Sequence, residues 1–176
     1  MTGAVVAGAL GLAVLLGVLG WRLPPTGRLA VSGGLLGLLG TAALVLAVSP
    51  VDGAGEVAVV VSLAGALAVA GGGVLTAAVF ALVDHGTAAS DGSISRAGEV
   101  LRGGAWIGGL ERAAVFTTLL ADWPEGLAVT LALKGLGRYP ELRTETPGAA
   151  ERFIIGTFTS VLWAVACAAL AALAVG

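Results

Sequence analysis

Charged side chains are scarce in this sequence. Only 11% of its 176 residues are charged and 57% are hydrophobic, whereas about a quarter of the residues in a typical soluble domain are charged. The mean hydropathy is +1.01. Since a helical membrane span needs about 20 apolar residues, most of the chain can lie inside a bilayer, and no soluble domain of useful size remains. The composition predicts an integral membrane protein.

Cysteine and histidine are almost absent as well. The single cysteine, Cys167, excludes a disulfide within the chain and stands in an apolar run, which predicts a buried thiol. The single histidine, His85, has no second histidine or cysteine near it, so we expect neither a metal site nor a cofactor. No HExxH, GxSxG or Walker motif occurs, so no catalytic class is indicated. The net charge of −2, with dispersed basic residues, argues against a nucleic-acid partner.

Six apolar runs predict an all-α, polytopic bundle of about six transmembrane helices. We expect a single membrane domain over residues 1–176, with an apolar three-span half at 1–83, a cytoplasmic loop at 84–102 and a charge-bearing three-span half at 103–176. The predicted spans are residues 3–21, 29–48, 57–83, 103–121, 125–138 and 149–175.

The connections between these runs differ in charge. Basic residues gather after the first, third and fifth runs, whereas the other two connections, SPVDGAGE and DWPE, carry only acidic residues. Because cytoplasmic loops retain arginine and lysine during insertion, both termini are expected on the non-cytoplasmic side. The sequence thus predicts a multi-pass protein of the cell inner (plasma) membrane.

Charged residues inside the last three runs stand out, because an ionised group near the centre of a span costs about 2.5–3.5 kcal/mol on insertion scales. Glu111 lies about 12 Å along its helix from Gly103, and Lys134 lies about 8 Å from Tyr139, at 1.5 Å per residue. The two helices are expected to be antiparallel neighbours, so Glu111 and Lys134 are predicted to pair. Arg112, beside Glu111, is equally deep.

Further charges flank these two helices and the last one. Glu151 falls in the first turn of the last helix, where a carboxylate is favoured by the helix dipole. We therefore predict a charge cluster in the cytoplasmic half of the membrane, made of Glu111, Arg112, Lys134, Arg138, Glu151 and Arg152. Bases outnumber acids in this set, so an anionic group such as a lipid phosphate or carboxylate would complete it.

Simpler interpretations stay open for the same residues. Lys134, Arg138 and Arg152 are close enough to the interface to act only as snorkelling topology anchors. Glu111 and Arg112 are too deep for that role, but a structural ion pair that fixes helix register would also explain them.

The last 75 residues or so resemble the C-terminal part of an uncharacterised bacterial integral membrane family. The likeness is carried by GAWIGGLERAAVF, LALKGLGRYPEL and AERFIIGTFTSVLWA, which match the family elements W/Y-IG-x-LER, K-x-x-x-R-F/Y and E-R/Y-F-x-IGT. The resemblance implies that the charges act as one constellation, and it implies no activity. The matching positions are Ile107, Gly108, Leu110, Glu111, Arg112, Lys134, Arg138, Glu151, Phe153, Ile155, Gly156 and Thr157.

Three functions fit these features. The first is binding or transport of a small polar or anionic group, or of a lipid head group, at the charge cluster. The second is a non-catalytic membrane subunit that docks a partner protein or a second copy of itself. The third is a lipid-modifying enzyme in which Glu111 acts as a base if burial raises its pKa. In all three the bilayer itself is the main partner.

Overall fold

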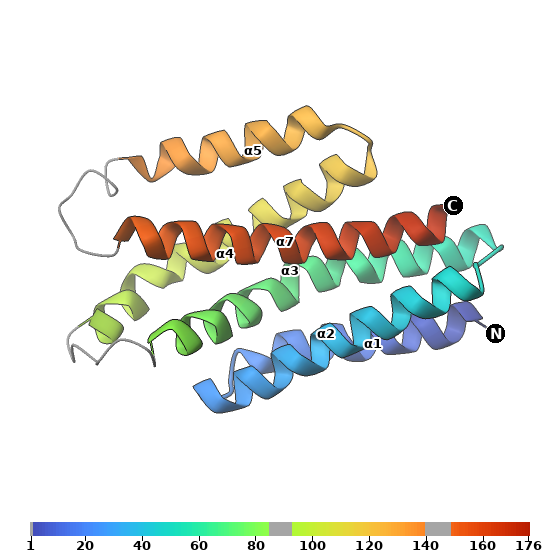
Figure 1. Ribbon diagram of the computed structural model, residues 1–176, viewed down its shortest axis with the longest axis horizontal. Helices are drawn as coiled ribbons and strands as arrows, with labels where there is room; N and C mark the ends of the chain where they lie inside the picture. Colours follow the sequence, from blue (N-terminus) through green and yellow to red (C-terminus); the bar gives the residue numbers. More distant parts are fainter. Residues whose placement is uncertain (1, 85–92, 140–148) are drawn as a thin grey trace.

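The structure, a computed structural model, describes residues 2–84, 93–139 and 149–176, and the regular elements in these segments are all α-helices (Figure 1). The helices are α1 (Thr2–Gly20), α2 (Pro25–Val48), α3 (Ala54–Asp84), α4 (Ser93–Leu120), α5 (Pro124–Gly137) and α7 (Ala149–Val175).

Four of these helices, α1, α2, α3 and α7, are long and apolar enough to cross a membrane. The chain is therefore described as a membrane-embedded helical protein. The other two helices differ for separate physical reasons. Charged residues interrupt α4, and α5 has 14 residues, about 21 Å at 1.5 Å per residue, against the 30 Å of a hydrocarbon core.

The helix ends differ from the predicted ones mainly at α4. The predicted cytoplasmic loop runs to residue 102, whereas α4 begins at Ser93 and continues without a break to Leu120. The segment SISRAGEVLR contains no proline, so nothing in it prevents the helix from continuing. His85 lies outside the described residues.

At the centre of the bundle lie α3 and α7. The long helix α3 packs against α1, α2, α4 and α7, and α7 also contacts α2 and α4. By contrast, α5 packs against α4 alone among the described elements and stands at the edge of the bundle (Figure 1). Both chain termini lie at the same end of the bundle (Figure 1).

Close approach between α3 and α7 depends on a glycine. A Cβ atom built on Gly71 would lie 2.8 Å from Cζ2 of Trp163, so the indole ring fits only because that position has no side chain. The Trp163 Nε1 group donates a hydrogen bond of 3.1 Å to the Leu67 carbonyl oxygen. Cys167, one turn further along α7, is fully buried with a free thiol, as the apolar run predicts.

A tight turn joins α4 to α5. Asp122 has φ 52°, a left-handed conformation that aspartate tolerates better than most residues. The Trp123 amide donates to the Thr118 carbonyl oxygen at 2.8 Å, and Pro124 starts α5. The turn sends α5 back antiparallel to α4, as expected, and brings Lys134 alongside Glu111.

Candidate functional site

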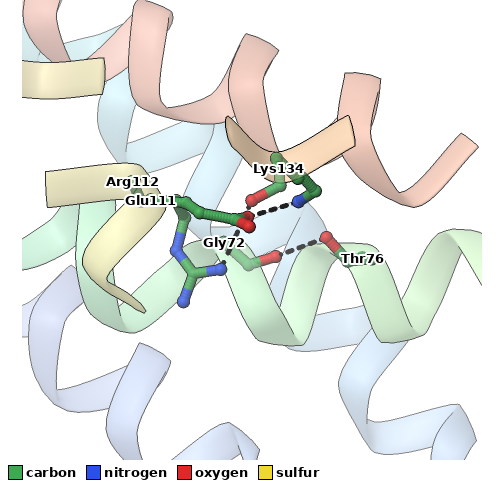
Figure 2. A network of polar contacts seen from close by, with 6 residues as sticks. Gly72, Thr76, Glu111, Arg112 and Lys134 are labelled. Carbon is green, nitrogen blue, oxygen red and sulfur yellow. Dashed lines mark hydrogen bonds and ion pairs between the residues drawn. The ribbon is translucent and has the colours of Figure 1, made fainter. Parts of the chain in front are cut away.

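An ion pair joins α5 to α4. The Lys134 ammonium nitrogen Nζ contacts Oε2 of Glu111, and the two side chains are only 15% and 18% exposed (Figure 2). The pair predicted from helix depth is therefore present. Among the described elements α5 packs against α4 alone, and this ion pair is one polar link between the two helices.

Arg112, the next residue of α4, points into the bundle and is 6% exposed. Its Nε and Nη2 groups donate hydrogen bonds of 3.1 and 2.7 Å to the Val69 carbonyl oxygen of α3. Its Nη1 group donates a bond of 3.3 Å to the Ser160 hydroxyl of α7. The guanidinium thus connects three helices through two neutral acceptors.

Two glycines make room for this buried side chain. A Cβ atom on Gly72 would overlap the Cδ and Nε atoms of Arg112, so the arginine stem crosses α3 where α3 has no side chain (Figure 2). A Cβ atom on Gly108 would lie 3.2 Å from Nη1. The Thr76 hydroxyl, one turn from Gly72, donates a hydrogen bond of 2.8 Å to the Gly72 carbonyl oxygen (Figure 2).

A small cleft lies where these groups meet. It is lined by residues of α4, α5 and α7, and the space open to the centre of a water molecule is about 10 Å³, which suits about one water. The residues around it include one carboxylate, two cations and two hydroxyls and so carry one more positive than negative charge, although the surface that they expose to the cleft is mostly apolar. The lining residues are Glu111, Arg112, Val115, Thr130, Leu131, Lys134, Ser160 and Val161.

The other three residues of the predicted cluster lie elsewhere. Arg138 follows the end of α5, Glu151 is exposed in the first turn of α7, and Arg152 lies over the Phe80 ring of α3 at 5.8 Å. None of the three lines the cleft. The structure therefore brings together Glu111, Arg112 and Lys134.

Sequence reasoning missed the acceptors of Arg112. The two acceptors, Val69 and Ser160, are 43 and 48 residues from Arg112 in the chain, and neither carries a charge that would mark it. Gly72, which the arginine stem crosses, is 40 residues away. The only sequence signal is the run Gly71–Gly72–Gly73 inside an otherwise apolar helix, which indicates a close approach by a neighbouring group. The apolar half of the chain thus supplies the backbone carbonyl that holds Arg112.

No family model, curated protein or solved structure matches this chain.

Proposed function

We propose that this protein binds an anionic, oxygen-bearing group, a phosphate or carboxylate, at the cleft between α4, α5 and α7. The group belongs either to a lipid head group or to a small solute that the protein passes across the membrane. We further propose that all six helices are embedded in the cell inner membrane with both termini on the non-cytoplasmic side. If α4 and α5 instead formed a hairpin that enters the bilayer and returns to the same side, the two chain termini would still lie on the non-cytoplasmic side.

One observation carries this proposal. Arg112 is buried in the bundle, its three hydrogen bonds go to an uncharged carbonyl and an uncharged hydroxyl, and Glu111, the carboxylate of the cleft, is already paired with Lys134. Glu111 is also close enough to Arg112 to act on it electrostatically, so one carboxylate serves two cations and the group keeps one surplus positive charge. Ionised residues inside a membrane are costly and usually mark a functional site. A bound anion would balance the surplus positive charge.

The size of the cleft limits what can enter it in this conformation. A phosphate or carboxylate group is larger than one water, so it enters only if α5 moves away from α7. Few contacts oppose that movement, because α5 packs against α4 alone among the described elements. The Glu111–Lys134 pair would then open, freeing the ammonium group to contact the anion.

Native mass spectrometry of the purified protein would test the proposal. The protein is exposed to equal amounts of phosphatidylglycerol and phosphatidylcholine, and in a separate arm to inorganic phosphate or acetate with melting followed in detergent. We expect either retention of the anionic lipid over the neutral one, which identifies a head group, or a rise in melting temperature with the small anion, which identifies a solute.

The variant Arg112→Gln should weaken this binding at least tenfold. Arg22→Gln is the matched control, because it removes the same charge from an exposed arginine between α1 and α2. If Arg112→Gln does not fold, Lys134→Gln replaces it. Equal binding by wild type, Arg112→Gln and Lys134→Gln, or no anion binding at all, would contradict the proposal and leave the cluster with a purely structural role.

A further inference from the structure

The hydroxyl of Thr157, on α7, is buried and has no hydrogen-bond partner. This is unusual for a helix-interior threonine, whose hydroxyl normally bonds to a carbonyl three or four residues back. Six other threonines in the described helices make that bond: Thr41, Thr76, Thr117, Thr118, Thr130 and Thr159. The Thr157 hydroxyl therefore has unused hydrogen-bonding capacity inside the protein.

Thr157 faces the same side of α7 as the cleft. Successive helix residues are about 100° apart, so the direction of Thr157 falls between those of Ser160 and Val161, one turn further along. Both of these residues line the cleft. Thr157 thus extends the polar face of α7 by one turn toward the N-terminal end of the helix.

Arg112 reaches toward the same level. Both α4 and α7 run in the same direction along the bundle (Figure 1), and Nη1 of Arg112 lies over Gly108, one turn toward the start of α4. The guanidinium has five N–H groups, and its bonds to Val69 and Ser160 use three of them. Because Gly108 has no side chain, Nη1 can lie close to the α4 backbone at this level.

We infer that Thr157 completes the anion site: its hydroxyl donates to one oxygen of the bound group while Arg112 holds another. This inference rests on the proposed function and adds a selectivity to it. A carboxylate or phosphate presents two or more oxygens and can use both donors at once. Donors spaced to hold two different oxygens cannot both contact a single halide ion, so the site should prefer oxyanions.

The test measures phosphate and chloride affinity, by anion-dependent melting in detergent, for wild type, Thr157→Val and Thr157→Ser. Valine keeps the shape of threonine and removes its hydroxyl, whereas serine keeps the hydroxyl. Thr159→Val is the matched control, since the Thr159 hydroxyl already bonds to the Ile155 carbonyl oxygen. Phosphatidylglycerol retention in native mass spectrometry provides the same comparison for a lipid phosphate.

We expect Thr157→Val to weaken phosphate or phosphatidylglycerol binding about five- to tenfold, with chloride affinity unchanged, and Thr157→Ser and Thr159→Val to behave as wild type. If wild type binds the oxyanion and Thr157→Val binds it equally well, the hydroxyl has another partner, such as a water, and this inference alone is wrong. If wild type binds neither anion, the proposed function fails together with it.

Discussion

The guanidinium of Arg112 in α4 donates two hydrogen bonds to the carbonyl oxygen of Val69 in α3, at 3.1 and 2.7 Å. The contact is possible because the arginine stem passes over Gly72. Moving a charge from water into the protein interior is costly unless hydrogen bonds replace its hydration. Here the Val69 carbonyl of a neighbouring helix provides part of those hydrogen bonds. The position of the Arg112 guanidinium thus depends on the lack of a side chain at Gly72.

Gly72→Ala should therefore destabilise the protein. The added methyl group overlaps the Arg112 stem, and overpacking of this kind typically costs about 1–3 kcal/mol. Gly37→Ala is the control, because nothing lies within 4 Å of a Cβ atom at that position of α2, so its stability should be unchanged or slightly raised. Unfolding in detergent measures both; equal stability of the two variants would show that Arg112 does not occupy this path.

The Glu111–Lys134 pair should be energetically coupled. Glu111→Gln and Lys134→Met each leave the partner charge uncompensated in a half-buried setting, so each should lower stability, and the double variant should recover part of the loss. A coupling energy of about 0.5–3 kcal/mol is expected for groups in contact. The measurement is a double-mutant cycle of unfolding free energies, and strictly additive effects would mean that the two residues act independently.

The fold and the pair follow from the sequence, but the rest of the site does not. Apolar run length was enough to locate α1, α2, α3 and α7, because each run is long and ends at turn-forming or polar residues. The depth of Glu111 and Lys134 on consecutive antiparallel helices predicted their contact, since a short turn fixes the relation between neighbours. The contacts of Arg112 depend instead on how α4 packs against α3 and α7, which no local pattern encodes.

Three residues of the predicted cluster, Arg138, Glu151 and Arg152, do not line the cleft. Arg152 packs over the Phe80 ring, and Glu151 is exposed, so the start of α7 does not deliver its charges to the cleft. Sequence position gave the depth of these residues but not the direction in which their side chains point. Conversely, Ser160 carries no charge, so its hydrogen bond with Arg112 follows only from the packing of α7 against α4.

Topology gives a further prediction. In a Cys167→Ala background, Asp52→Cys in the connection between α2 and α3 should react in intact cells with a membrane-impermeant thiol reagent, whereas Arg22→Cys between α1 and α2 should not. The reason is the positive charge that cytoplasmic connections retain. Both positions are exposed, so access to the reagent depends on the side of the membrane, and the reverse labelling pattern would invert the proposed orientation.

The native thiol should stay unlabelled under the same conditions. Cys167 is fully buried among apolar side chains of α7 and its neighbours, and a buried thiol without a nearby base is unreactive. Labelling of the wild-type protein is compared before and after denaturation. Rapid reaction of the folded protein would mean that α7 does not pack as described.

Movement of α5 should be required for binding. Leu131 of α5 and Val161 of α7 both line the cleft, so cysteines at these positions, in a Cys167→Ala background, can be joined by a short bifunctional thiol reagent. The joined protein should lose anion binding, whereas the same variant treated with a monofunctional reagent of similar size should lose less. Undiminished binding after cross-linking would show that the anion enters without displacement of α5.

The most direct measurement is an experimental structure determined in a bilayer that contains phosphatidylglycerol, with inorganic phosphate present. We expect an oxygen of a head group or of phosphate within about 3 Å of an Arg112 nitrogen, with Lys134 turned toward the same group. A cleft that holds no more than water, with the Glu111–Lys134 pair closed and Arg112 bonded only to Val69 and Ser160, would contradict anion binding as the function of this site.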